Sequence, residues 1–356
     1  MRSKSGGGLH DGRSKKTPTP TLPLSRGGSE RNLMPKAMIC RELGAPEVLR
    51  LEHFDSKPLA GGQVRVRVRA AGLNYPDVLM VAGEYQHKPP LPFVPGLESA
   101  GEVSEVANGV AGVAVGDRVI VKSRGALTEE IVVAPSALAP MPKNFDYAQG
   151  ATFLAAHGTA YYGLVDRAQI RPGETLLVHG AAGGVGLAAV ELGKVYGANV
   201  IAVASTEEKL AIARQRGADH TLLAGQPFRD KVKELTAGRG ADVVFDPVGG
   251  TVFEESVRCI NWGARLIIVG FLAGVGVART NLVLIKNATV HGIRAGEAVR
   301  QDPSLGPPRQ RDLMAFAEQG KISPNISHRL PLERTAEAMR LLIERKAIGR
   351  VAVEMG

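Results

Sequence analysis

The sequence predicts an α/β protein that combines a β-rich domain with a doubly wound parallel-sheet domain. Residues 64–72, VRVRVRAAG, alternate as the residues of a half-buried strand do. From about residue 175 onward, short apolar runs alternate with amphipathic runs, which indicates parallel strands connected by helices on both faces of a sheet. At the first strand-to-helix junction of that region lies a glycine-rich stretch, LVHGAAGGVG, at 177–186.

The order of the elements predicts one domain inserted into another. Before the junction, further short strands are expected at 116–121 and 129–134, and residues 91–103 are expected to form a loop that enters a strand. After it, the expected strands are 175–180, 199–204, 218–223, 241–250 and 264–270, and the expected helices are 184–198, 207–217, 228–238 and 253–260. A helix at 333–346 and a strand at 349–355 then resume the β-rich style. We therefore predict a β-rich domain from 34–156 and 292–356, and a dinucleotide-binding domain from 157–291.

The glycine-rich stretch predicts the dinucleotide site. Missing side chains let the backbone approach a pyrophosphate, and the amino end of the following helix offers free N–H groups. The spacing G-x-x-G-x-x-G departs from the usual G-x-G-x-x-G, so the strand–loop–helix context carries the assignment. A turn needed only for helix–strand packing is the alternative. The expected cofactor contacts are Gly180, Ala182, Gly183, Gly184, Val185 and Gly186.

The residues after the second strand bear on the choice of cofactor. Proteins that bind NAD usually end this strand with an acid for the ribose 2′-hydroxyl, and a carboxylate would repel a 2′-phosphate. Here the strand is followed by Ser205, Thr206 and Lys209, two hydroxyls and an ammonium. We therefore predict NADPH. Ser205 with Glu208 also fits a capping box for the next helix, and a solvated surface position is the alternative for Lys209.

Composition excludes several classes of protein. The net charge of +9 suggests nucleic acid, but residues 1–33 carry seven basic and two acidic residues, which leaves +4 for the other 323. Residues 1–33 are rich in Gly, Ser, Pro and Arg, so we expect a disordered leader and hypothesise that Met34 is the initiator. Two cysteines form no disulfide framework, and no apolar run approaches about 18 residues, so we expect a cytoplasmic protein without a membrane span.

The order of the motifs resembles a known family. GLNYPDVLMVAGEY (72–85), PFVPGLESAGEV (92–103), HGTAYYGL (157–164), GAAGGVG (180–186) and DPVGG (246–250) occur in sequence. The chain is similar over residues 35–355 to the zinc-independent quinone oxidoreductases of the medium-chain dehydrogenase/reductase superfamily, the zeta-crystallin-like group. The resemblance implies a GroES-like catalytic domain, a Rossmann domain, and NADPH-dependent reduction of quinones or of α,β-unsaturated carbonyl compounds.

The resemblance also poses the question of zinc. Related zinc alcohol dehydrogenases carry a cysteine and the histidine of a Gly-His-Glu triplet as metal ligands. This chain has Asn74 and Leu97 at those positions, and neither side chain can replace a thiolate or an imidazole. The eight histidines do not fall into ligand spacings. We therefore expect no metal.

Without zinc, other groups must stabilise the negative charge that develops on the substrate oxygen. Asn74 offers an uncharged amide donor and is expected to contact the reacting end of the cofactor or the substrate. Tyr85 resembles the tyrosine implicated in proton donation in related enoyl reductases, and an aromatic at the cleft rim is the alternative. Asp77, in the same motif, is expected to be a hydrogen-bond acceptor rather than an acid.

The remaining expected contacts come from the resemblance. Thr159 should lie near the nicotinamide, Phe271 and Leu272 should border it, and Asn281 and Arg350 should supply polar contacts to the cofactor. The resemblance implies a homodimer, and the apolar stretch 264–274 is expected to pair with the second subunit at the dimer edge.

Two alternatives to a quinone or enone reductase stay open. One is an enoyl-CoA or acryloyl-CoA type of reductase, which the basic residues Lys122 and Arg124 would favour if they lie at the mouth of the cleft, although a solvated turn is the other interpretation. The second is a protein that binds NADPH without catalysis, as crystallins and RNA binders of the resembling group do. Nucleic acid is not an expected partner, because the charge outside the leader is small.

Overall fold

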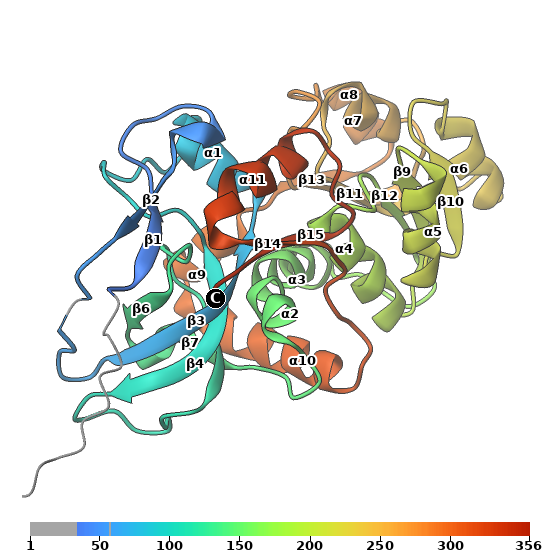
Figure 1. Ribbon diagram of the computed structural model, residues 1–356. Coiled ribbons are helices and arrows are strands. Elements are labelled where there is room, and N and C mark those ends of the chain that lie inside the picture. Colours follow the sequence, from blue (N-terminus) through green and yellow to red (C-terminus); the bar gives the residue numbers. More distant parts are fainter. Residues whose placement is uncertain (1–33, 57) are drawn as a thin grey trace, which may run out of the picture. The chain divides into compact units, whose positions relative to one another are not determined.

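The computed structural model describes residues 34–56 and 58–356 (Figure 1). The predicted fold class is confirmed, because a six-stranded parallel sheet is combined with a seven-stranded, mainly antiparallel sheet. The predicted leader at 1–33, on which the hypothesis about the initiator depends, lies outside the described residues. The domain boundaries at 156/157 and 291/292 stay predictions.

The six-stranded sheet has the strand order of a doubly wound fold. Its strands, in spatial order and all parallel, are β10 (His220–Leu223), β9 (Asn199–Ala204), β8 (Thr175–Val178), β11 (Ala241–Asp246), β12 (Ile260–Ile268) and β13 (Thr289–Gly292). The connecting helices are α4 (Gly184–Val195), α5 (Glu207–Gln215), α6 (Arg229–Leu235), α7 (Gly250–Ser256) and α8 (Thr280–Ile285). Every residue of β8 is buried, as a strand covered on both faces requires.

The structure corrects two expectations in this sheet. Strand β12 begins at Ile260 rather than 264, and α7 therefore ends at Ser256, four residues before the predicted end of that helix. The stretch 264–274 was expected at a dimer edge, but β12 lies between β11 and β13 and pairs with both, so its backbone is not free to pair with a second chain. Strand β13 occupies that edge of the sheet.

The seven-stranded sheet joins segments that are far apart in the sequence. Its path is β14 (Ile326–Pro331), β15 (Arg350–Glu354), β3 (Val64–Leu73), β4 (Glu98–Val106), β5 (Arg118–Val121) and β7 (Leu138–Pro140), and β6 (Glu130–Val133) pairs with β3. A separate hairpin consists of β1 (Lys36–Ile39) and β2 (Arg50–His53). Strand β15 lies between β14 and β3, which places red β15 against blue-to-cyan β3 in Figure 1.

Helices complete the core. The remaining helical elements are α1 (Tyr75–Ala82), α2 (Tyr147–Ala151), α3 (Leu154–Tyr161), α9 (Ala295–Gln301), α10 (Gly306–Glu318), α11 (Thr335–Ile343), the short turns η1 (Pro46–Val48), η2 (Pro135–Ala137), η4 (Pro303–Leu305) and η5 (Leu332–Arg334), and the π-helical η3 (Tyr162–Arg167). Phe153, at the start of α3, is fully buried in a core that also contains Ile120 of β5 and Phe245 of β11. One apolar core therefore contacts both large sheets.

Candidate active site

Strand register brings the first group of candidate residues to one end of the seven-stranded sheet. Gly72 of β3 is opposite Glu98 of β4, and Leu73 is opposite Val351 of β15. Asn74 directly follows β3, and Arg350 and Glu98 begin their strands. Their side chains therefore meet although their positions in the sequence are far apart.

Arg350 and Glu98 form a buried ion pair. Arg350 Nη2 lies 2.6 Å from Glu98 Oε1, and the two residues are only 7% and 2% exposed. The Ala155 backbone N–H donates to the other carboxylate oxygen at 2.9 Å. Burial raises the pKa of Glu98, and the positive charge of Arg350 opposes that rise. Each of the two buried charges is thus stabilised by the opposite charge of the other.

Asn74 is held beside this pair as the N-cap residue of α1. Its backbone N–H donates to Asp77 Oδ2 at 2.8 Å, and its side-chain amide reaches Gly72 O and Glu98 Oε1, each at 3.4 Å. Asp77 is fully buried, and burial raises its pKa to about 7. The contact shows Asp77 in the accepting role expected for it. Both bonds of the side-chain amide are long, so they are weaker than the 2.8 Å bond of the backbone.

The glycine loop lies against the same cluster. Helix α4 begins at Gly184, no side chain caps it, and its first N–H groups have no partner within the helix. A side chain at Gly184 would lie 2.6 Å from Arg350 Cδ, and a Cβ at Gly186 would lie 2.2 Å from the Gly180 carbonyl oxygen. The loop can therefore hold an anion at the helix end only with glycine at these positions.

Backbone contacts attach this loop to the seven-stranded sheet. Gly349 N donates to Ala182 O at 2.7 Å, and Gly183 and Gly349 form an isolated bridge. Val185 is partly exposed in the first turn of α4. The predicted dinucleotide loop and the Arg350–Glu98 pair are therefore parts of one arrangement.

A second group of candidate residues lies after β9. Lys209 Nζ is 3.3 Å from Ser205 Oγ and donates to Arg345 O at 2.7 Å. The structure corrects the predicted capping box, because Thr206 and not Ser205 caps α5, accepting the Lys209 N–H at 3.3 Å. Ser205 is consequently free of the capping role and remains exposed beside an ammonium. This arrangement can accept an anion.

Arg345, which the sequence did not single out, links this group to the loop after β12. Arg345 Nη2 donates to Leu272 O at 2.8 Å, while its own carbonyl oxygen accepts from Lys209. Phe271 and Leu272 are 54% and 41% exposed, as residues lining an open site would be. Arg345 has a φ of +56°, which is an uncommon backbone conformation for a residue other than glycine.

The other candidate residues are less closely connected. Thr159 on α3 donates to Ala155 O at 2.7 Å, one turn from the N–H that binds Glu98. Tyr85 is partly exposed after α1, and within the described part of the chain its hydroxyl has no hydrogen-bond partner. Asn281 is exposed on α8, and its side chain forms no hydrogen bond with another candidate residue in the described part of the chain. Its contact with the cofactor therefore stays a prediction.

A buried network behind α4 was missed at the level of sequence. Glu191 on α4 lies 2.9 Å from His157 Nε2 and 2.8 Å from Arg216 Nη1. Arg216 also donates to Asn325 Oδ1 at 3.1 Å, and the Asn325 amide donates to Ile348 O at 2.9 Å. The network therefore supports the segment that precedes Arg350. In the sequence, the charged Glu191 among the apolar residues of α4 was the signal that could have indicated this network.

His179, directly before Gly180, gives a prediction about stability. It is 1% exposed, its Nε2 lies 2.8 Å from Ser256 Oγ, and burial lowers its pKa to about 3. Because the unfolded chain takes up this proton below about pH 6.5, the His179 contribution to stability is lost as pH falls, by about 1.4 kcal/mol per pH unit. We expect urea midpoints measured from pH 7.5 to pH 5 to fall less steeply for His179→Gln than for the unsubstituted chain. If the urea midpoints of both proteins fell equally steeply with pH, the lowered pKa of His179 would be contradicted.

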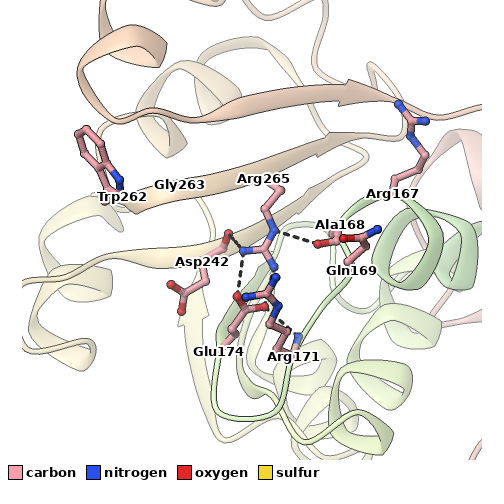
Figure 2. Close-up of a pocket in the computed structure, with 9 residues that line it drawn as sticks. All are labelled: Arg167, Ala168, Gln169, Arg171, Glu174, Asp242, Trp262, Gly263 and Arg265. Atoms are coloured by element: carbon pink, nitrogen blue, oxygen red, sulfur yellow. Dashed lines mark hydrogen bonds and ion pairs between the residues drawn. The ribbon is translucent and has the colours of Figure 1, made fainter.

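One cavity of about 330 Å³ lies away from these residues (Figure 2). Glu174 precedes β8 whereas Gly180 follows it. The cavity therefore lies at the amino end of β8, and the glycine loop lies at its carboxyl end. Arg265 reaches into it and donates to both oxygens of Glu174, at 2.9 and 2.6 Å. This ion pair ties β12 to the turn before β8.

Comparison with known proteins identifies the family. Residues 60–143 match the alcohol dehydrogenase GroES-like domain, and residues 184–305 match the zinc-binding dehydrogenase family. The quinone oxidoreductase-like protein 2 homolog of Nematostella vectensis is 40% identical over 324 residues, which cover 89% of this chain and 88% of that protein. The chain belongs to the quinone oxidoreductase family of medium-chain dehydrogenases/reductases. Human quinone oxidoreductase is 30% identical over 306 residues, covering 85% of this chain and 92% of that one.

Solved structures agree with this assignment. A mycobacterial protein in complex with NADPH is 29% identical with a TM-score of 0.82, covering 90% of this chain and 99% of that one. The CurK enoyl reductase is 28% identical with a TM-score of 0.83, covering 91% and 100%. This quinone oxidoreductase family member is thus an oxidoreductase that binds a nicotinamide cofactor, and the expectation of an enzyme is confirmed.

The zinc implied by the name of the matched family does not fit the residues of this family member. Asn74 and Leu97 offer neither a thiolate nor an imidazole, and the oxygens of Glu98 already bind Arg350, Ala155 and Asn74. Within residues 34–56 and 58–356, no three His, Cys, Asp or Glu side chains are grouped so that they could hold a metal ion. The same residues include no helix that is both long and apolar enough to cross a membrane.

Proposed function

We propose that this chain is an NADPH-dependent reductase of quinones or of activated alkenes, and that it transfers hydride without zinc. The observation that carries the proposal is the sheet end, where the neutral amide of Asn74 stands beside the Arg350–Glu98 pair in place of a metal centre. The names of the relatives in Nematostella vectensis and human support quinones as acceptors.

The residues that would hold NADPH lie on two elements. The free N–H groups of the first turn of α4 would bind the pyrophosphate, and Lys209 with Ser205 would bind the 2′-phosphate. The structural neighbour in complex with NADPH supports this choice of cofactor. When bound, the cofactor supplies hydride to the acceptor.

The chain's own groups would then manage the charge that develops on the acceptor oxygen. Asn74 donates an N–H to that oxygen, since an uncharged donor stabilises negative charge without itself needing a buried counter-ion. The Arg350–Glu98 pair orients Asn74 through the 3.4 Å contact to Glu98 Oε1. Tyr85 would donate a proton to an enolate. We place the site between these groups and the exposed Phe271 and Leu272.

Turnover of purified chain tests the proposal directly. Oxidation of NADPH would be followed with 9,10-phenanthrenequinone, 1,4-benzoquinone and crotonyl-CoA as separate acceptors. Turnover of a quinone with NADPH is the expected result. Tight NADPH binding without turnover of any acceptor would overturn it and would favour a protein that acts by binding.

Replacing Lys209 by glutamate should reverse the preference between cofactors. The carboxylate would repel the 2′-phosphate and could accept a hydrogen bond from the 2′-hydroxyl of NADH. We expect the ratio of kcat/KM for NADPH to that for NADH to fall by about 100-fold, because losing a charge-assisted contact costs about 1.5–3 kcal/mol. Lys231→Glu, on exposed α6, is the control and should leave the ratio unchanged. An unchanged ratio in Lys209→Glu would remove this residue from the proposed 2′-phosphate site.

An enoyl reductase is the second candidate, and two observations favour it. The CurK neighbour is named an enoyl reductase, and the Tyr85 hydroxyl is free of protein partners within the described residues. Since only an enolate needs a proton on carbon, Tyr85→Phe should lower kcat for an enone by about 100-fold and leave quinone reduction nearly unchanged. Equal effects on both acceptors would count against proton donation by Tyr85.

A further inference from the structure

Two cations lie just beyond the sheet end that carries the candidate active site. Val121, the last residue of β5, is opposite Ser99 of β4. Lys122 therefore follows β5 at the end of the sheet where β4 begins with Glu98. Arg124 follows two residues later, and the Gly125 N–H next to it donates to Gly96 O at 3.0 Å. The segment 122–125 therefore borders the Gly96–Glu98 segment.

Lys122 has no anionic partner among the described residues. Its Nζ donates to Gln310 Oε1 of α10 at 2.5 Å, and Gln310 is an uncharged acceptor. Lys122 is exposed, yet nearby protein groups partly desolvate its ammonium and lower its pKa. A partly desolvated cation without a counter-ion is unfavourable, and a bound anion would offset that cost.

Arg124 also lacks an anionic partner. Its Nη1 lies 2.6 Å from His87 Nε2, and it forms no ion pair with a carboxylate of residues 34–56 or 58–356. His87 is two residues from Tyr85, so this contact joins Arg124 to the segment that holds the proposed proton donor. Lys122 and Arg124 thus present two positive charges, neither of them paired with a carboxylate of the described residues, from one short segment beside the site.

We propose that Lys122 and Arg124 together recognise an anionic group on the acceptor, so that the preferred substrates are quinones or enones carrying a carboxylate, phosphate or sulfonate. The inference rests on the proposed function and assigns its substrate class. Two cations bind such a group through charge-assisted hydrogen bonds, and their field raises its rate of association. A neutral acceptor gains neither effect.

A matched pair of acceptors tests the inference. The probes are 1,4-naphthoquinone and its 2-sulfonate, reduced with NADPH by the full chain and by Lys122→Gln/Arg124→Gln. Comparing the two proteins on each acceptor cancels the intrinsic reactivity of the quinones. The control is Lys143→Gln/Lys231→Gln, which removes the same charge at exposed positions outside the site.

We expect the Lys122→Gln/Arg124→Gln variant to lose at least about tenfold in kcat/KM for the sulfonate and less than about threefold for the neutral quinone. Added salt should lower kcat/KM for the sulfonate in the unsubstituted chain and leave the neutral quinone unaffected. Equal losses on both quinones, or the same loss in the control, would overturn the inference and leave the proposed function standing. Absence of turnover with either quinone in the unsubstituted chain would overturn the proposed function and the inference with it.

Discussion

Replacing Arg350 by methionine should lower the free energy of unfolding by about 3–5 kcal/mol, because it leaves the buried carboxylate of Glu98 without its counter-charge. Urea denaturation, followed by circular dichroism, measures the change. The loss should shrink as the pH falls. Burial holds the folded-state pKa of Glu98 above its ordinary value, so its ionisation destabilises the folded chain as pH rises, and protonation at low pH removes the unpaired charge.

Two further variants decide whether the loss belongs to the buried pair. Removing both charges, in Arg350→Met/Glu98→Gln, should restore most of the stability, because no unpaired ion then remains buried. Arg340→Met breaks the exposed pair between Arg340 and Glu47 and should hardly move the midpoint. If Arg350→Met and Arg340→Met had similar midpoints, Arg350 would not stabilise the fold in the way that its burial indicates.

Replacing Gly186 by alanine should weaken the binding of NADPH. The new Cβ would lie 2.2 Å from Gly180 O and 2.8 Å from Ala181 Cα, and both are backbone atoms that cannot move without reshaping the loop. Overpacking of this kind costs about 1–3 kcal/mol. If the cost must be met in the loop conformation that binds the pyrophosphate, the Kd for NADPH should rise by about 10- to 100-fold. Titration of the fluorescence of bound NADPH measures it.

The control for this loop is Gly296→Ala on α9. A Cβ at Gly296 meets no atom within 4 Å, and alanine favours the helix. Its affinity for NADPH should match that of the unsubstituted chain. An unchanged Kd in Gly186→Ala would mean that the glycine serves helix–strand packing alone, which was the alternative considered for the motif.

Much of the fold could be predicted because its signals are local. Residues 199–204 were predicted as a strand because a parallel strand covered on both faces is mostly apolar, as residues 200–204 are, and the same strand is observed as β9. The start of α4 at Gly184 agrees with the predicted junction of loop and helix. The cap of α5 was predicted wrongly, because Ser205 and Glu208 fit the capping-box pattern in the sequence, whereas in the folded chain the Thr206 side chain accepts the Lys209 N–H.

The candidate site was predictable only in part because it depends on register. Asn74 was found through its motif, whereas its neighbours Glu98 and Arg350 are 252 positions apart and meet through the pairing of β4, β3 and β15. Periodicity predicts which face a side chain occupies but not which strand lies beside it. The role of Asn281 stays a prediction, since the resemblance supplied only its position in the sequence and the structure places it on exposed α8.

The place of β15 has a consequence for the order in which the protein is made. Strand β3 is complete early in synthesis, but β15, its neighbour on one side, emerges from the ribosome only after the entire six-stranded sheet. Until then the backbone groups of residues 70–73 that pair with β15 are an open edge, which is the kind of surface on which partly folded chains aggregate. The parallel sheet, whose strands are contiguous in the sequence, can close first. A chain stopped before Arg350 would keep that edge exposed and would be a substrate for chaperones and proteases.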